Sequence, residues 1–327
     1  MKRRLTYKTL TLLLCAIGAL TVCSCHKKNE PVKSHRFEQL LFETKPAELQ
    51  KKMTEQRADY NSPLLNIMPG DPRYMESVIG FVSDPFMREI YRLTDSCYHN
   101  IGWLEKELSP ALAKARNLDD SIHYTHFYTM VTGDLEDYNN RVFCNHSDLV
   151  VSIDHYILPY TKNMGYCNCP MYIVNLSDKQ YMAADCMAAI ARAHIVKPEG
   201  EDLSLLDYMV MEGKVQYFLD QVMPDKHDTI KLRYSADQLS WVEHSEKDVW
   251  TYFLKNDLLY ETDMARIHNF IDEAPKTNAF RNSAPRTTQY IGRQIIRKYM
   301  KKTGKSLHEL FENSDSQSIL AASGYKP

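Results

Sequence analysis

The segment 204–260 constrains the fold of this chain most strongly, because it marks the ends of several helices by itself. At three places a serine is followed three residues later by an acidic or amide residue: Ser204 with Asp207, Ser235 with Gln238, and Ser245 with Asp248. This is the spacing of a capping box, in which the serine accepts a hydrogen bond from a first-turn N–H and the second side chain bonds back to the cap. The segment therefore predicts three helices in succession.

The first and the last of these predicted helices each carry one apolar face. In both, apolar side chains recur every three or four residues, which places them along a single side of a helix. The first helix ends before Pro224, which cannot continue a helical hydrogen-bond pattern. We expect the following side chains to be buried: Tyr208, Met211, Val215, Phe218 and Val222 from the first helix, and Trp250 and Leu254 from the last.

The overall charge argues against some classes of protein. The chain has 327 residues, with 40 Lys and Arg against 42 Asp and Glu, which gives a formal net charge of −2. A nearly neutral chain offers no strongly basic face, so no nucleic-acid partner is expected. Its 11 glycines form no phosphate-binding loop and no dinucleotide-binding motif, so no cofactor is expected.

The N-terminus is typical of a secreted lipoprotein. Residues 1–4 are basic, and residues 10–22 form an apolar run that is shorter than the roughly 20 residues of a membrane span. The run ends in Val-Cys-Ser-Cys, which resembles the bacterial lipobox, where cleavage precedes a lipidated cysteine. We predict that residues 1–24 are a signal peptide, that Cys25 carries the lipid, and that residues 25–35 are a polar tether. An ordinary secretory signal is the alternative.

Five further cysteines follow Cys25, and an odd number leaves at least one thiol free or paired with another molecule. An envelope location permits a disulfide, but the sequence leaves the pairing open. Cys167 and Cys169 are too close together for the usual C-x-x-C zinc-binding pair, and no second pair follows them. We therefore expect no zinc knuckle.

The order of the predicted elements indicates one α+β domain in which helices predominate. Helical patterns extend to residue 118, and Pro110 is expected to break the last of them. Residues 122–132 are rich in β-branched and aromatic side chains and predict a strand, followed by short strands at 141–144 and 148–154. Helices resume at residue 178. We predict a small antiparallel or mixed sheet packed by helices, in a single domain over residues 36–327.

The sequence contains no complete catalytic motif. It lacks H-E-x-x-H, which gives a zinc peptidase two imidazole ligands and a general-base glutamate. It also lacks the G-x-S-x-G turn that presents a serine nucleophile in many hydrolases. We therefore assign no catalytic residue and no metal ligand.

Several longer motifs together resemble one family. They are RFEQLLF at 36–42, LLDYMVMEGKVQYFLD at 205–220, SWVEHSEKDVWTYFLKNDLLYETD at 240–263, APRTTQYIGRQIIRKY at 284–299, and the closing Ser-x-Tyr-Lys-Pro. With the lipobox, they make nearly the whole mature chain similar to the gliding-motility-associated lipoprotein GldB family of the Bacteroidetes envelope. The resemblance implies a lipoprotein linked to gliding or to the associated secretion machinery. It also implies attachment to the outer membrane through the lipid, and contacts with other envelope proteins.

That family is in turn similar to zinc-dependent peptidases, in which a short sheet precedes an H-E-x-x-H helix and a second helix supplies a glutamate from an E-G motif. Glu212 and Gly213 stand where that glutamate is expected. The preceding helix, near residues 185–189, has no histidine pair, and His194 is its one imidazole. The resemblance therefore implies a degenerate zincin-like metallopeptidase architecture, with Asp185, His194 and Glu212 as candidates for a remnant site.

Three hypotheses follow for the function. The first is a lipoprotein that is not an enzyme and that acts through protein contacts, with neither metal nor cofactor. The second is a hydrolase with an unconventional site around Asp185, His194 and Glu212. The third is a lipoprotein that binds a glycan or a peptide in a groove lined by some of its 21 tyrosines. A metal assay separates the first two, and a groove with exposed aromatic side chains would favour the third.

Replacing Cys25 with alanine should release the protein from the membrane fraction. The predicted attachment depends on acyl chains on Cys25 and not on a transmembrane helix. The matched control is Cys23→Ala, which should remain in the membrane pellet. Immunoblotting of soluble and membrane fractions measures both. A membrane-bound Cys25→Ala together with a released Cys23→Ala would assign the lipid to Cys23.

Overall fold

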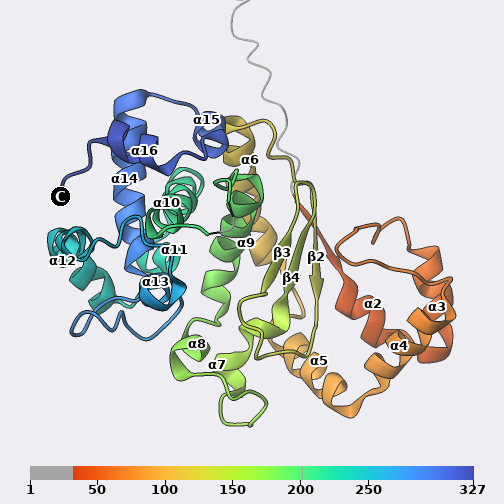
Figure 1. The fold of residues 1–327 in the computed structure, drawn as a ribbon. Helices are drawn as coiled ribbons and strands as arrows, with labels where there is room; N and C mark the ends of the chain where they lie inside the picture. The colour runs from red at the N-terminus through yellow and green to blue at the C-terminus, as the bar shows by residue number, and fades with distance from the viewer. Residues whose placement is uncertain (1–31, 201) are drawn as a thin grey trace, which may run out of the picture. The chain divides into compact units, whose positions relative to one another are not determined.

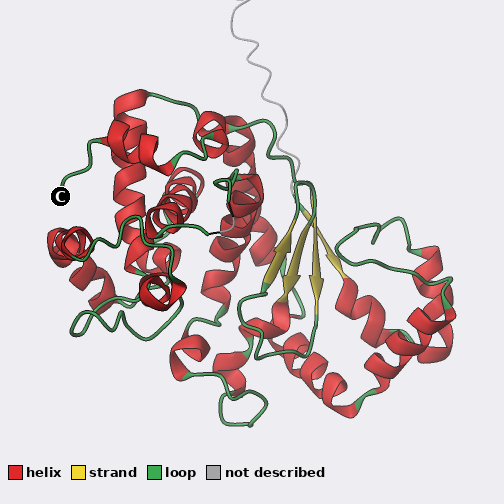
Figure 2. Cartoon of the chain, viewed as in Figure 1, coloured by secondary structure: helices red, strands yellow, loops and turns green. Residues whose placement is uncertain are grey.

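A four-stranded sheet lies between two groups of helices (Figure 1). The computed structural model describes residues 32–200 and 202–327, and these residues belong to one unit. Residues 1–31, which include the predicted signal peptide and Cys25, lie outside the described part. Helices make up most of the described chain and strands make up little of it, which confirms the predominantly helical α+β prediction (Figure 2).

The sheet is mixed, in the order β1-β2-β4-β3. β1 pairs in parallel with β2, β2 pairs in parallel with β4, and β3 runs antiparallel to β4. Of the two predicted alternatives, the mixed sheet is therefore correct. β4 is buried along its whole length, as is usual for a parallel strand that is covered on both faces. The strands are β1 (Lys33–Arg36), β2 (His126–Met130), β3 (Val142–Cys144) and β4 (Leu149–Ser152).

Strand β1 comes from the end of the predicted tether. Residues 33–35 pair with β2, where Lys33 lies opposite His126, so the sheet begins before residue 36. The sequence KSHR has no strand pattern of its own. It becomes a strand because β2 offers a row of backbone N–H and C=O groups that would otherwise remain unpaired at the edge of the sheet.

Four helices after β1 share a hydrophobic cluster of their own. The first of them packs against β2, and the other three pack on it or on one another in the red and orange region of Figure 1. The starts of α4 and α5 follow from the sequence, because Asp71 and Asp84 cap them and a proline occupies the first helical position of each. The four helices are α2 (Phe37–Glu43), α3 (Pro46–Glu55), α4 (Pro72–Ser83) and α5 (Pro85–Tyr98).

On the other side of the sheet, α9 (Lys179–His194) packs against β3 and β4 and separates them from α10 (Figure 1). Helix α6 (Gly102–Leu118) packs against α9. The predicted break at Pro110 is wrong, because α6 continues through it. Proline removes one helical hydrogen bond, but the buried Leu108 and Leu112 on either side of it keep the two halves of the helix in place.

The C-terminal group is built around α10 (Leu205–Val222) and α14 (Thr287–Thr303), which cross at two glycines. A Cβ added to Gly213 would lie 2.9 Å from the Cα of Gly292. A Cβ added to Gly292 would overlap the carbonyl group of Met209 on α10. The backbones of the two helices therefore touch, and no side chain fits between them.

Eight further helical elements complete the fold. Short turns of helix follow β4 and lead to α9, and five helices pack around α10 and α14. These elements are η1 (Ile153–Tyr156), α7 (Leu158–Thr161), α8 (Met171–Asn175), α11 (Asp228–Leu232), α12 (Ala236–Lys255), α13 (Met264–Ile271), α15 (Leu307–Glu312) and α16 (Ser316–Ser323).

Two of the three predicted capping boxes are confirmed. Ser204 begins α10 and Ser235 begins α12, each with both hydrogen bonds of the box. The box predicted at Ser245 is wrong, because α12 passes through it without interruption. Neither glycine nor proline stands before Ser245, so the preceding turn stays helical. The N–H groups there then have intrahelical partners and need no cap.

The predicted apolar face of α10 is largely confirmed. Val215, Phe218 and Val222 are buried, whereas Tyr208 and Met211, nearer the start of the helix, are half-buried. In the first turns of α10 the buried side chains are instead Leu205, Leu206, Met209 and Val210, so Tyr208 and Met211 lie at the edge of the buried face.

On α12, one of the two burial predictions is confirmed. Trp250 is 8% exposed, as predicted, but Leu254 is 49% exposed and that prediction is wrong. Phe253, one residue earlier, is fully buried instead. Spacings of three and four residues both fit a helical face, so the sequence pattern did not distinguish Phe253 from Leu254.

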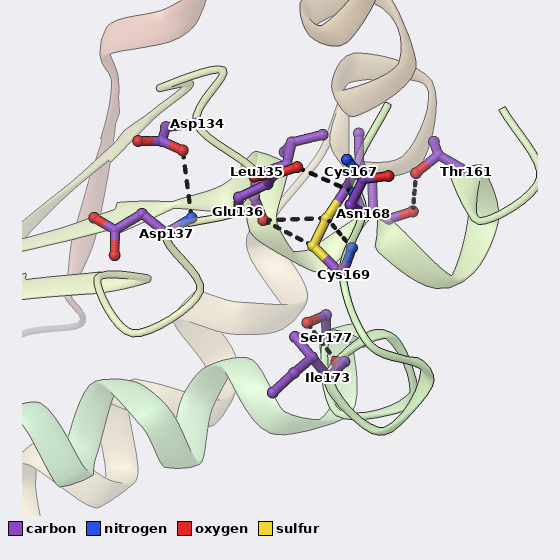
Figure 3. The surroundings of a disulfide bond; sticks show 11 residues. Asp134, Leu135, Glu136, Asp137, Thr161, Cys167, Asn168, Cys169, Ile173 and Ser177 are labelled. Carbon is purple, nitrogen blue, oxygen red and sulfur yellow. Dashed lines mark hydrogen bonds between the residues drawn. A yellow bond between two sulfur atoms is a disulfide. The ribbon is translucent and has the colours of Figure 1, made fainter. Parts of the chain in front are cut away.

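Cys167 and Cys169 form a disulfide between α7 and α8 (Figure 3). Their Cα atoms are 5.2 Å apart. The N–H of Asn168 donates to the carboxylate of Glu136 at 3.1 Å, and both sulfur atoms lie against the carbonyl oxygen of Leu135. The loop is thus held against the segment that follows β2, and the pairing that the sequence left open is resolved. The free cysteines in the described residues are Cys97, Cys144 and Cys186.

Gly292→Ala should destabilise the protein by roughly 1–3 kcal/mol or more, because the added methyl group meets the backbone of α10 and not a flexible side chain. Gly80→Ala is a matched control, since Gly80 lies in α4 with no atom within 4 Å of an added Cβ. That change should stabilise the protein by about 0.5–1 kcal/mol through helix propensity. Chemical denaturation measures both. A Gly292→Ala variant as stable as the wild type would show that the close crossing is not required.

Candidate functional site

The three candidate residues do not share one site. Arg192 of α9 pairs with Glu212 of α10 and, like Asp185, lines the cavity described below, whereas Glu212 does not line it. His194 is nine residues after Asp185, which is half a turn around the helix and about 13 Å along it. Its ring packs against His146 at 4.9 Å between centroids, and its Nε2 lies 3.4 Å from the hydroxyl of Tyr124. His194 therefore belongs to the region of the β3–β4 turn.

Asp185 is paired with an arginine from a distant segment. Nη1 of Arg233, at the end of α11, donates to both carboxylate oxygens of Asp185 at 2.6 and 2.7 Å. The hydroxyl of Tyr156 donates to Asp185 Oδ2 at 2.8 Å. Arg233 also donates through Nε to Glu273 at 3.2 Å and through Nη2 to the carbonyl of Leu176 at 2.7 Å. Asp185 thus accepts three hydrogen bonds, and two carboxylates share one guanidinium.

Glu212 is paired with Arg192 of α9. Nε and Nη2 of Arg192 donate to the two carboxylate oxygens of Glu212 at 3.0 and 2.8 Å, which is the bidentate geometry. The side chains are 50% and 26% exposed, so the pair lies nearer to solvent than Asp185. Burial by itself would raise the pKa of Glu212, but Arg192 lowers it. Glu212 therefore stays ionised and paired with Arg192.

A cavity of about 310 Å³ lies where α9, α10, α11 and the start of β3 meet. Lys231, one of the residues that line it, is already neutralised, because its Nζ lies 2.8 Å from Asp220 and 2.9 Å from Asp228. The cavity is nevertheless more basic than acidic. Its charged lining residues are Arg141, Arg192, Lys231, Arg233 and Arg286 against Asp185 and Glu273.

The acidic groups of the cavity serve as partners for the arginines. Burial by itself would raise the pKa of Glu273, but Arg286, Arg233 and Arg141 together lower it to about 2. A carboxylate that is so strongly stabilised in its ionised form is a weak proton acceptor near neutral pH. Glu273 is therefore poorly suited to act as a general base.

Two of the arginines adopt a backbone conformation that is uncommon for residues other than glycine. Arg233 follows α11 with φ of 56°, and Arg286 precedes α14 with φ of 43°. The left-handed region costs an L-residue about 1–2 kcal/mol, so the surrounding structure must impose it. Both residues line the cavity, and strain of this kind is concentrated at binding and active sites.

The residues around the two carboxylates offer little to a metal ion. In residues 32–200 and 202–327, no three His, Cys, Asp or Glu side chains are grouped in a way that could hold one. Three and four residues after Asp185, the same face of α9 carries Ala188 and Ala189. Cys186 points into the core, fully buried, and burial raises the pKa of its thiol. It is therefore a poor ligand and a poor nucleophile.

Sequence reasoning found Asp185 and Glu212 but missed their partners. One usable signal was present, because Arg192 follows Asp185 by seven residues and so shares its helical face. No such signal marks Arg233 or Arg286, which lie in separate segments without a motif. Folding alone brings them to the cavity.

Comparisons with known proteins agree with the motifs described for the sequence. The chain matches the family described as “Gliding motility protein GldB” over residues 24–327. No curated protein and no solved structure is similar enough to match. In the part of the chain that the structure describes, none of the helices has the length and apolar character that a membrane span requires.

Arg233→Met should lower the free energy of unfolding by about 3–5 kcal/mol at pH 7, because it leaves Asp185 without its buried counter-charge and removes one of the arginines around Glu273. Arg92→Met is the matched control. Arg92 pairs with Glu89 on the surface, where its side chain is 64% exposed, and the loss there should be much smaller because water screens an exposed ion pair. Urea denaturation measures both variants, and equal losses would show that the cavity pair has no special role in stability.

The deficit of Arg233→Met should shrink on acidification. Pairing lowers the pKa of Glu273 from 4.5 to about 2, so its stabilising effect is complete above pH 4.5 and is lost as the pH falls toward 2. Without Arg233, the carboxyl group of Glu273 is protonated at a higher pH. Once it is protonated, it no longer carries a buried negative charge that lacks this partner. The stability curves of the two proteins should therefore converge between pH 4.5 and 2. Parallel curves would contradict this account of Glu273.

Proposed function

Because the chain belongs to the lipoprotein family of the gliding motility protein GldB, we propose that it is an envelope lipoprotein that acts through contacts with other proteins and not by catalysis. Its partners are proteins of the gliding apparatus or of the associated secretion machinery. It is attached to the outer membrane by a lipid on Cys25. The observation that supports a non-catalytic role is the engagement of Asp185 and Glu212 by arginines.

The residue types at the α9–α10 contact fit ion pairing better than catalysis. A catalytic zinc needs three protein ligands, a bound water and a general base beside that water. Here Glu212 gives both oxygens to Arg192, and Asp185 accepts hydrogen bonds from Arg233 and Tyr156. The alanines that follow Asp185 on the same face provide no further ligand.

The position of strand β1 supports a role close to the membrane. If Cys25 carries the lipid, residues 26–32 are the seven residues between the anchor and the first residue of β1. A fully extended segment of that length reaches about 25 Å. The folded domain is then held near the bilayer surface, where it meets other membrane-attached envelope proteins.

The two alternative functions have weaker support. A hydrolase built from Asp185, His194 and Glu212 would need groups that lie on opposite faces of α9. A glycan-binding groove would need clustered aromatic side chains. The exposed aromatic residues include Phe86, Phe143, Tyr160 and Tyr260, and none of these four lines the cavity beside α9.

Elemental analysis of protein purified without chelators should show well under one zinc ion per chain, and assays with general peptidase substrates should be blank. Arg192→Ala provides the sharper test, because it frees both oxygens of Glu212. That variant should still bind no zinc, since the neighbouring alanines supply no ligand. Stoichiometric zinc in the wild type, lost in Glu212→Gln, would overturn the non-catalytic proposal and favour the hydrolase.

A further inference from the structure

The disulfide between Cys167 and Cys169 closes a very short loop, because its two cysteines are only two positions apart in the sequence. A disulfide stabilises a fold mainly by constraining the unfolded chain, and this effect grows with the length of the closed loop. Here the loop contains a single intervening residue, Asn168. The fold therefore depends little on this bond.

The bond lies in the loop between α7 and α8 (Figure 3). Neither Cys167 nor Cys169 is fully buried, and Asn168 between them and Pro170 after them are exposed. The turn that precedes them, residues 162–165, is exposed throughout. Disulfides in exposed positions are the ones that react most readily with thiols, and they include the regulatory and catalytic ones.

The hydrogen-bonding groups around the two sulfur atoms suit the opened form of the bond. The N–H of Cys169 donates to Sγ of Cys167 at 3.0 Å. Such a donor stabilises a thiolate, so Cys167 is the better leaving group of the pair. The carbonyl oxygen of Leu135 lies 3.7 Å from Cys167 Sγ and 3.3 Å from Cys169 Sγ. A disulfide sulfur has no proton to donate to this oxygen, whereas a thiol has one.

Exposed apolar side chains lie close to the disulfide. Met164, three residues before the first cysteine, is 50% exposed, and Met171, two residues after the second, is 56% exposed. The ring of Tyr166 meets that of the exposed Phe86 of α5 at 5.9 Å between centroids. Methionine adapts to the shape of a partner and is common at protein-binding surfaces. These four residues form an apolar surface beside the disulfide, on which a polypeptide segment can pack.

We propose that the Cys167–Cys169 disulfide exchanges with a cysteine of a partner protein that carries apolar side chains next to that cysteine. The thiolate of the partner attacks Sγ of Cys169, the bond between the two sulfur atoms breaks, and its electron pair leaves on Sγ of Cys167. Cys167 then takes up the proton that the partner thiol has lost. One disulfide is broken and one is formed, so the step needs no external oxidant or reductant.

This inference rests on the proposed function, because it specifies one contact between this envelope protein and its protein partners. An oxidising envelope allows disulfides to persist. The exchange joins the two chains once and involves no turnover. Attack by the freed Cys167 reverses it and returns both proteins to their starting states.

The test follows adduct formation on the full mature chain in detergent. Every protein carries Cys97→Ser, because Cys97 is free and exposed. The probes are two capped peptides with one reduced cysteine each, acetyl-Leu-Cys-Phe-amide and acetyl-Ser-Cys-Ser-amide. Both are uncharged, because the carboxylate of Glu136 lies beside the loop, 3.1 Å from the amide nitrogen of Asn168. After an acid quench, intact mass and peptide mapping give the amount and the position of the adduct.

Each chain should gain at most one peptide, attached to Cys169, while Cys167 becomes available to an alkylating reagent. The Leu-Cys-Phe peptide should react about tenfold faster than the Ser-Cys-Ser peptide, because burial of its apolar side chains favours the encounter with the apolar surface.

Variants of the apolar surface connect this rate to the site. Replacing Met164 and Met171 together with serine should lower the rate of the Leu-Cys-Phe peptide to about that of the Ser-Cys-Ser peptide, whose own rate should not change. Both methionines are exposed, so the fold does not depend on them. Met264→Ser is the matched control, since Met264 is exposed in α13, and it should change neither rate.

Four results would overturn the proposal: two free thiols at positions 167 and 169 in protein purified without reductant, no adduct with either peptide, an adduct on Cys167 in place of Cys169, or equal rates for the two peptides. The exchange can fail while zinc remains absent and peptidase assays remain blank, and the non-catalytic proposal then stands. Stoichiometric zinc that is lost in Glu212→Gln would instead reject the non-catalytic proposal and leave the adduct unchanged.

Discussion

The backbone contact between α10 and α14 at Gly213 and Gly292 is the constraint on which the rest of the structure depends. A charged residue stands next to each glycine and forms an ion pair with another helix: Glu212 precedes Gly213, and Arg293 follows Gly292. Glu212 reaches Arg192 of α9, and Arg293, which is 1% exposed, donates to Asp220 of α10 at 2.9 Å. A side chain at either glycine would separate the helices and move both ion pairs. Close packing of two backbones thus sets the geometry of groups on two sides of α10.

The cavity beside α9 combines features that contribute little to stability or reduce it. Buried ion pairs often add little to stability compared with apolar residues of the same size, and two of the arginines here also occupy the left-handed region. A fold selected for stability alone has no reason to combine these features. Departures from local rules are expected where a protein has a function to perform.

Much of the helical framework could be predicted because its signals are local. Ser204 and Ser235 act through hydrogen bonds within one turn, and the buried face of α10 follows from its period. The errors have a common cause. Ser245 has the spacing of a cap inside a continuous helix, and Leu254 fits the period of α12 as well as the buried Phe253 does. In each case two local structures satisfy the pattern equally, and packing with distant segments chooses between them.

The sequence by itself determined the capped starts of α4, α5, α10 and α12 and the mainly helical α+β class, because these depend on neighbours within a few residues. Tertiary structure decided everything that makes the cavity. It added β1 to the sheet and brought Arg141, Arg233 and Arg286 together from segments more than 40 residues apart. Charges attract over distance in space and not along the chain, so no pattern in the sequence records which carboxylate each arginine will meet.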